Sequence, residues 1–378
     1  MERRVRFLKI LLLPVFILLV VHLAGCATLS AKRVPRESSF AYQYSDTSLA
    51  KAYKNEIAAH SGQSGFLLLG SGMDAFAART ALFAKAEKSI DVQYFTVWDD
   101  MAGNLFFRAL LEAANRGVRV RILLDDVLVH KIDERLAVLE QHPGIEVRSF
   151  NPLSRSFPRF AQYIFQFGKY SRRMHNKSVI VDNAVTILGS RNIGNKYAGV
   201  SPSRTNIIFS GLDVLGVGPV VGMVSDSFDQ YWNSRHSIRV SNLTKPANMS
   251  VGEVVGNGHD KPLAKQYQAF LWTSPLNRQI REDVLKFEWG HARVVADSPD
   301  KITQQMERDG YLNAIELKKH VADTNRELWI VSPYVVPGGR DGMAFFREMR
   351  RRGVKVTIVT NSYASTDNKL TNAHYAKY

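Results

Sequence analysis

Cysteine is nearly absent from this chain of 378 residues, which contains only Cys26. A single cysteine cannot form a disulfide within the chain. Acidic residues are also scarce, because 35 Asp and Glu stand against 50 Lys and Arg and give a formal net charge of +15. A surface with this charge attracts anionic phospholipid or nucleic acid. Hydrophobic residues make up 45% of the sequence, so a sizeable globular core is expected.

Long apolar runs are scarce as well. The N-terminal run, Ile10 to Val21, is too short for a comfortable membrane span, and basic residues precede it. It leads into Leu-Ala-Gly-Cys at positions 23–26, which resembles a bacterial lipoprotein signal. The resemblance implies that residues 1–25 are a signal peptide and that Cys26 becomes the lipidated N-terminus. An uncleaved N-terminal anchor is the alternative.

This resemblance also predicts where the protein acts. Because no Asp follows Cys26, it implies a membrane-anchored lipoprotein of the cell envelope that faces the periplasm, sorted to the outer membrane. A lipid anchor together with basic side chains favours the membrane surface as the partner. Phospholipid is therefore expected as the substrate class, and no nucleic acid partner is expected.

The remaining sequence alternates strand-like and helix-like segments. Residues 26–61 are polar and predict a tether followed by an initial helix. Residues 89–98, 104–115 and 118–124 predict a strand, a helix and a strand, because apolar periodicity changes from one segment to the next. This alternation indicates parallel strands joined by right-handed crossovers.

A similar pattern recurs late in the chain. Residues 328–336 predict a strand and residues 342–351 a helix, and the following RGVKVTIVTN echoes the earlier RGVRVRILLD. Two matched elements in the same order indicate an internal duplication. The sequence therefore predicts an α/β fold with two similar halves, residues 62–245 and residues 246–378, each a sheet flanked by helices.

The strongest chemical signal is one motif with fixed spacing. It consists of His175, Lys177, Asp182, Gly189, Ser190 and Asn192. His175 and Lys177, two residues apart near a strand, are expected to converge on one point. A neutral imidazole can attack phosphorus, and an ammonium can neutralise the phosphate oxygens as charge builds up. Ser190 and Asn192 can donate hydrogen bonds to the same oxygens. No cluster of ligating side chains accompanies the motif, so no metal or other cofactor is implied.

These residues resemble the signature of the phospholipase D superfamily, His-x-Lys-x4-Asp-x6-Gly-Ser-x-Asn. Further segments resemble the bacterial cardiolipin synthase branch, and the envelope type called cardiolipin synthase C in particular. They are IDVQYF at 90–95, FNP at 150–152, NIGN at 192–195, DVLGVGP at 213–219 and FDQYW at 228–232. The resemblance implies a duplicated α-β-α sandwich with one motif in each half. One His then forms a phosphohistidine, the other acts as acid and base, and each Asp orients rather than reacts.

The implied function is a phosphatidyltransferase that acts on membrane phospholipids and forms cardiolipin. Phosphatidylglycerol or phosphatidylethanolamine would donate, and an alcohol headgroup would accept. Two alternatives stay open, a phospholipase D-type hydrolase that uses water and a single-motif nuclease that dimerises. The sequence contains one motif, and the repeat spacing places a second His near position 411, beyond Tyr378. The sequence therefore predicts an incomplete second half and an inactive form of the enzyme; it does not predict the oligomeric state.

Two secondary features remain. Basic residues upstream of the motif alternate with aromatic ones, which suits a membrane interface or a partly buried helix with a solvated basic face. The basic residues are Arg155, Arg159, Lys169, Arg172 and Arg173, and the aromatic ones are Phe157, Phe160, Tyr163, Phe165, Phe167 and Tyr170. Asp99-Asp100 and Asp125-Asp126 follow predicted strands, where either pair could orient a His or simply form a turn.

Overall fold

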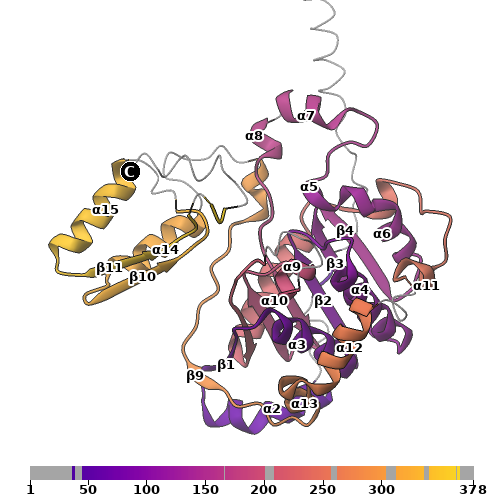
Figure 1. Cartoon of the computed structure of the whole chain (residues 1–378), viewed down its shortest axis with the longest axis horizontal. Helices are drawn as coiled ribbons and strands as arrows, with labels where there is room; N and C mark the ends of the chain where they lie inside the picture. The colour runs from indigo at the N-terminus through magenta and orange to yellow at the C-terminus, as the bar shows by residue number, and fades with distance from the viewer. Residues whose placement is uncertain are drawn as a thin grey trace, which may run out of the picture. The chain divides into compact units, whose positions relative to one another are not determined.

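The computed structural model describes most of the chain after residue 44 (Figure 1). The described residues are 36–38, 45–165, 167–200, 208–256, 262–303, 312–335, 340–362 and 364–366. The predicted signal peptide and Cys26 therefore lie outside the described residues. The chain divides into two compact units, residues 1–305 and residues 306–378.

The first unit is built on a nine-stranded mixed sheet with the order β8-β4-β3-β2-β5-β6-β7-β1-β9. Its strands are β1 (Ser64–Leu69), β2 (Ser89–Tyr94), β3 (Arg119–Asp125), β4 (Ile145–Phe150), β5 (Ser178–Val181), β6 (Val185–Gly189), β7 (Asp213–Val217), β8 (Ser237–Arg239) and β9 (Glu288–Gly290). Strands β2, β3 and β4 run parallel, and the sequence predicts this arrangement for β2 and β3. The other described pairs of this sheet are antiparallel.

Helices cover both faces of this sheet. The helices of the first unit are α2 (Ser48–Ala59), α3 (Gly72–Lys85), α4 (Met101–Asn115), α5 (Asp126–Val129), α6 (Asp133–Leu139), α7 (Arg159–Phe165), α8 (Phe167–Tyr170), α9 (Asn195–Ala198), α10 (Pro219–Trp232), α11 (Val251–Val254), α12 (Pro262–Thr273) and α13 (Pro275–Arg281). Among the helices within the described residues, none is both long and apolar enough to cross a bilayer.

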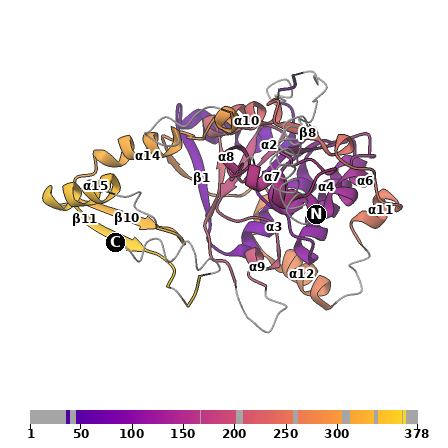
Figure 2. The same cartoon turned by 90° about the horizontal axis from the view of Figure 1, so that it is seen from above.

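Two hydrophobic cores lie on opposite faces of the sheet. Val179 and Val181 of β5 belong to the core beneath α3 and α4, whereas Ile180 between them belongs to the core beneath α10. Figure 2 shows α10 and α3 on different sides of the strands. This alternation follows from the two-residue period of a strand, which sends successive side chains to opposite faces. The first unit is therefore a three-layered α-β-α structure, as the sequence predicts.

Local sequence explains why the crossover helix α4 begins and ends where it does. Asp100 caps its start by accepting a hydrogen bond of 3.1 Å from the Gly103 N–H. Phe106 and Leu110 lie one turn apart on the buried side of the helix. Gly117, with a φ of 92°, then lets the chain turn into β3.

The first unit extends beyond residue 245, the predicted boundary between the halves. Strand β9 pairs with β1, and α13 packs on α3. Tyr267 of α12 is fully buried and donates a hydrogen bond of 3.0 Å to the Asn195 Oδ1. Residues 246–303 therefore complete the first unit wherever they are described, because their apolar side chains fill the core under α3.

The second unit contains a parallel pair of strands, β10 (Glu327–Val331) and β11 (Lys355–Val359), with α14 (Leu312–Ala322) and α15 (Arg340–Arg351). The order β10-α15-β11 matches β2-α4-β3, and both strand pairs are parallel. Gly353 has a φ of 80°, as Gly117 has a positive φ at the corresponding turn. This likeness supports the predicted duplication, which stays a prediction.

Candidate active site

The sheet brings the predicted catalytic segment to one of its edges. His175 and Lys177 lie in the irregular segment directly before β5. The first residue of β5, Ser178, pairs with Leu188 near the end of β6 and with Gln93 near the end of β2. The ends of β2 and β6 and the start of β5 therefore meet at one edge, which is called the site edge below. The parallel strands β3 and β4 also end there, where α/β proteins usually bind ligands.

His175 and Lys177 share an aromatic neighbour at this edge. The His175 ring lies 4.8 Å from the Phe95 ring between centroids, and the Lys177 Nζ lies 5.6 Å from the same centroid. Lys177 is buried, and its Nζ donates a hydrogen bond of 2.7 Å to the His175 carbonyl oxygen. The two residues therefore converge as their spacing predicts, although they lie in an irregular segment and not in a strand.

The surroundings shift the pKa of both side chains. His175 is exposed, yet the protein around it displaces enough water to lower its pKa to about 4, and Lys177 and Lys301 act in the same direction. Burial lowers the pKa of Lys177 to about 8, although the carboxylates of Asp125 and Asp213 oppose this shift. At neutral pH the imidazole is therefore uncharged, and the ammonium beside it keeps most of its charge.

Asp125, at the end of β3, fixes the backbone that leads to His175. Its carboxylate accepts a hydrogen bond of 2.8 Å from the Met174 N–H and forms an ion pair of 2.8 Å with Arg173. The carboxylate is fully buried and also caps α5 through the Val127 N–H. Of the two predicted Asp pairs, it is thus Asp125 that reaches the segment before His175. Asp100 instead caps α4 and accepts a hydrogen bond from the Asn195 N–H.

Position 189 must be a glycine because the Asp213 carboxylate lies against it. Asp213 is not among the site residues predicted from the sequence. A Cβ at Gly189 would lie 1.9 Å from the Asp213 Oδ1, which is far inside van der Waals contact. Asp213 opens β7, is buried, and forms an ion pair of 2.8 Å with Arg79 of α3. Arg79 also donates a hydrogen bond of 2.7 Å to the Tyr94 hydroxyl at the end of β2. This buried group therefore ties β2 to β7 across the site edge.

The two predicted phosphate-binding side chains differ in their exposure. Ser190 is exposed at the site edge, and its hydroxyl exchanges hydrogen bonds with the backbone of Leu212, at 3.0 Å and 3.2 Å. Asn192 is buried; its Oδ1 accepts from the Thr96 N–H at 3.3 Å, and its Nδ2 donates to the Tyr197 hydroxyl at 3.1 Å. Asn192 therefore links the loop after β2 to the loop after β6.

Asp182 is not brought to His175. It lies in the turn after β5, and the four residues of β5 separate it from Lys177 by roughly 16 Å of extended chain. Its carboxylate accepts hydrogen bonds from the backbone N–H groups of Glu87, Lys88 and Ser89, at 3.0, 2.8 and 2.9 Å. The motif's Asp therefore anchors the β5–β6 turn to the start of β2. Its place among the catalytic residues stays a prediction.

The sequence was compared with family models and with known proteins to find the family to which this chain belongs. A family model described as "Cardiolipin synthase, PLD-like domain" matches residues 80–210. Cardiolipin synthase C of Escherichia coli (strain K12) is 39% identical over 336 residues, which cover 87% of this chain and 69% of that protein. The chain belongs to the cardiolipin synthase family of the phospholipase D superfamily. The predicted family is thereby confirmed, and with it a phospholipase D-type phosphatidyltransferase.

Two further proteins resemble this cardiolipin synthase family member over different lengths. Cardiolipin synthase A of Pseudomonas putida (strain GB-1) is 31% identical over 170 residues, which cover 44% of this chain and 33% of that protein. Among solved structures, phosphatidylserine synthase of Haemophilus influenzae Rd KW20 is similar over 88% of this chain and 72% of that chain. Its sequence identity is 12% and its TM-score is 0.49.

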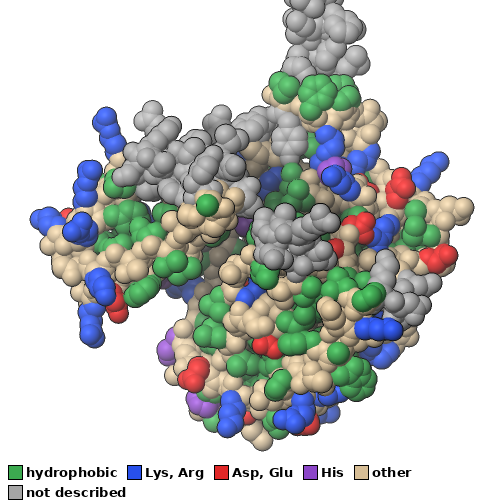
Figure 3. Space-filling view, viewed as in Figure 1, with side chains coloured by type: hydrophobic (Ala, Val, Ile, Leu, Met, Phe, Trp, Pro, Cys, Tyr) green, Lys and Arg blue, Asp and Glu red, His purple; other side chains and the backbone are tan. Residues whose placement is uncertain are grey.

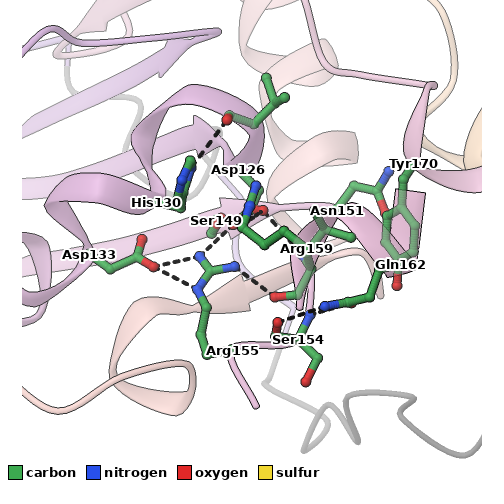
Figure 4. A network of polar contacts seen from close by, with 12 residues as sticks. Asp126, His130, Asp133, Ser149, Asn151, Ser154, Arg155, Arg159, Gln162 and Tyr170 are labelled. Atoms are coloured by element: carbon green, nitrogen blue, oxygen red, sulfur yellow. Dashed lines mark hydrogen bonds and ion pairs between the residues drawn. The ribbon is translucent and has the colours of Figure 1, made fainter. Parts of the chain in front are cut away.

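In this family member the basic residues upstream of the motif are largely paired with acids. Arg155 forms ion pairs of 2.5 Å with Asp126 and 2.6 Å with Asp133, and Arg159 forms one of 3.0 Å with Asp126 (Figure 4). Burial acts to raise the pKa of Asp126, but Arg155 holds this pKa below its usual range. Asp126 therefore anchors the segment before α7 and does not face His175. Across the described residues, no three His, Cys, Asp or Glu side chains gather in a way that could hold a metal ion.

Proposed function

We propose that this protein transfers a phosphatidyl group through a phosphohistidine on His175 and thereby forms cardiolipin. The proposal rests on one observation. The exposed, neutral imidazole of His175 lies beside the buried ammonium of Lys177, which is hydrogen-bonded to the His175 carbonyl oxygen. A neutral imidazole has a lone pair for phosphorus, and the adjacent cation can stabilise the charge that develops on the phosphate oxygens.

The proposed reaction has two displacement steps. In the first, an imidazole nitrogen of His175 forms a bond to phosphorus, and the bond from phosphorus to the leaving oxygen breaks. In the second, the hydroxyl of an acceptor lipid forms a bond to phosphorus, the bond from phosphorus to the imidazole nitrogen breaks and releases neutral His175, and the hydroxyl proton passes to water or buffer. Lys177 neutralises the phosphate oxygens in both steps, and Ser190 at the site edge donates a hydrogen bond to one of them. Asn192 donates one of its two amide N–H groups to the Tyr197 hydroxyl, which leaves the second for the same role.

The first step also needs a proton for the leaving oxygen when that oxygen belongs to an alcohol. The sequence contains one His-x-Lys-x4-Asp motif. The reaction with phosphatidylglycerol or phosphatidylethanolamine therefore needs an acid besides His175, and the resemblance to the superfamily implies a second histidine in this role. A phosphodiester whose leaving group is stable as an anion avoids this requirement.

The proposed place of action is the cell envelope, with the chain attached to the membrane through a lipid on Cys26. The support is the Leu-Ala-Gly-Cys sequence at positions 23–26 and the family membership. Lipidation would hold the site edge close to its bilayer substrate.

An activated lipid tests the proposed reaction without the second histidine. The purified chain is mixed with phosphatidyl-p-nitrophenol and phosphatidylglycerol, and the lipid products are identified by mass spectrometry. Cardiolipin is the expected product, and His175→Ala should abolish it. His142→Ala is the matched control, because His142 lies in the turn before β4, at the opposite end of the strand from the site edge.

Three results would contradict the proposal. Cardiolipin formation that survives His175→Ala would remove the nucleophile. Phosphatidic acid as the sole product would assign a hydrolase in place of a transferase. Cleavage of plasmid DNA that depends on His175, without any lipid product, would assign a nuclease.

A further inference from the structure

Helix α7 exposes two large apolar side chains on one side. Phe160 is 71% exposed and Ile164 is 68% exposed. They are four residues apart, so they lie next to each other on the helix surface. Hydrophobic side chains gather at the position of α7 in the space-filling view (Figure 3). Exposing two such side chains to water is unfavourable by about 25 cal/mol for each Å² of apolar surface, which points to a surface that is covered when the protein works.

Ion pairs and hydrogen bonds fix the N-terminal part of α7 and the segment before it. Arg155 and Arg159 pair with the buried carboxylate of Asp126, as Figure 4 shows. The Gln162 side chain is buried, accepts a hydrogen bond of 2.9 Å from the Ser154 N–H and donates one of 2.9 Å to the Ser154 carbonyl oxygen. Phe160 and Ile164 are therefore exposed on a helix that is held in place by these contacts. The part of the chain from Arg155 to Arg173 is called the α7–α8 projection below.

The projection also has a positive charge to match an anionic surface. It contains five Arg or Lys residues and no acidic residue. Three carboxylates pair with its arginines, those of Asp125, Asp126 and Asp133. Five positive and three negative charges leave a net charge of about +2, which anionic phospholipid attracts by about 1 kcal/mol for each basic residue near the surface.

The projection leads directly into the site. The chain passes from α8 through residues 171–174 to His175, and Asp125 binds two of these residues, Arg173 and Met174. Figure 1 shows α7 and α8 beyond the end of β4, away from the body of the first unit, and Figure 2 shows them over the strands. A surface that contacts the projection is therefore close to the site edge.

From these observations we infer that the α7–α8 projection docks on the phospholipid bilayer, with Phe160 and Ile164 inserted at the level of the headgroups. The inference rests on the proposed function, because a phosphatidyl donor must reach His175 from a bilayer. Apolar side chains with flanking basic residues are the combination that binds a membrane interface. The projection thus presents His175 to the headgroup phosphates.

A probe at one residue can test insertion even if another part of the chain also binds lipid. Cys26→Ser removes the only native thiol, and Ile164→Cys then provides a single site for an environment-sensitive NBD label. Vesicles of phosphatidylethanolamine and phosphatidylglycerol should shift the NBD emission to the blue, and nitroxides on the acyl chains should quench it. The matched control is Trp272→Cys on α12, which is 75% exposed in the same unit and should report no change.

A second variant tests the contribution of the aromatic ring. Phe160→Ser in the labelled chain should raise the lipid concentration needed for the emission shift by about tenfold, because an inserted aromatic side chain contributes roughly 1.5 kcal/mol or more. No shift at position 164, or an equal shift at position 272, overturns the inference. A shift without vesicles that grows with protein concentration assigns the surface to a second copy of the chain and overturns it too. The probe needs no turnover, so a failure of the proposed function does not alter its result.

Discussion

The pH dependence of phosphohistidine formation is the prediction that the structure specifies most fully. An unperturbed histidine, with a pKa of about 6.5, is only about one quarter neutral at pH 6. His175, whose pKa is lowered to about 4, is almost entirely neutral at that pH. Because the neutral imidazole is the nucleophile, the rate should stay level as the pH falls from 7 to 5 and should decrease only near pH 4. At pH 6 the two cases differ about fourfold.

Lys177 sets the alkaline side of the same profile. Its pKa is lowered to about 8, so the ammonium loses its proton as the pH rises through that value, and the phosphate oxygens lose their neighbouring charge. The rate should therefore decrease above about pH 8. Lys177→Arg keeps its charge throughout this range, because the guanidinium pKa exceeds 12. The variant should react more slowly, since its geometry differs, but its rate should no longer decrease at pH 8.

The assay follows the initial burst of p-nitrophenol from phosphatidyl-p-nitrophenol. Each sample is quenched in alkali before it is read, so that the colour does not depend on the reaction pH. Circular dichroism at each pH shows that the protein remains folded, and His142→Ala should leave the profile unchanged. An acid decrease centred near pH 6.5, or an alkaline decrease that persists in Lys177→Arg, would refute this account of the two side chains.

Three further substitutions test the contacts around the site, and a fourth tests the lipid anchor. Asp182→Ala should lower the free energy of unfolding by about 2–4 kcal/mol, because three backbone N–H groups lose their acceptor; a denaturant titration measures this, and an unchanged stability contradicts the anchoring role. Gly189→Ala should destabilise the protein, whereas Gly70→Ala, which has open space at its Cβ, should not; equal melting temperatures would show that the close approach of Asp213 is unimportant. Asp125→Asn should slow the burst by about 10- to 100-fold through misplacement of His175, and an unchanged rate in a folded variant argues against positioning. Cys26→Ser should move the protein out of the membrane fraction of cells, and normal processing and retention would contradict lipidation.

The sequence predicts the central part of the fold well, and physical reasons explain why. Residues 89–124 carry strong signals, since apolar β-branched runs alternate with an amphipathic helix that ends at Gly117. The far strand β9 carries almost none, because Glu288–Gly290 is short and partly exposed. The predicted boundary at residue 245 therefore lies before the end of the first unit, because pairing between β9 and β1 depends on contacts more than 200 residues apart in the sequence.

The candidate site is predictable only in part, for a similar reason. His175 and Lys177 are found because both belong to one short motif. The carboxylates that support them come from the ends of other strands, and Asp125 contacts Met174 across 49 residues of sequence. Asp213 is the first residue of a segment that resembles the family, yet its position against Gly189 appears only when β6 and β7 pair. Asp182 is the opposite case. It is close to Lys177 in the motif, but the two residues lie at opposite ends of β5.

The most direct test of the central claim is the isolation of a covalent phosphatidyl group on His175. The purified chain is treated with phosphatidyl-p-nitrophenol, denatured in alkali to protect an acid-labile phosphohistidine, and digested for mass spectrometry. The account predicts one modified residue, His175, in wild-type protein and in His142→Ala, and none in His175→Ala. A modification on another residue, or release of p-nitrophenol without any adduct on His175, would contradict it.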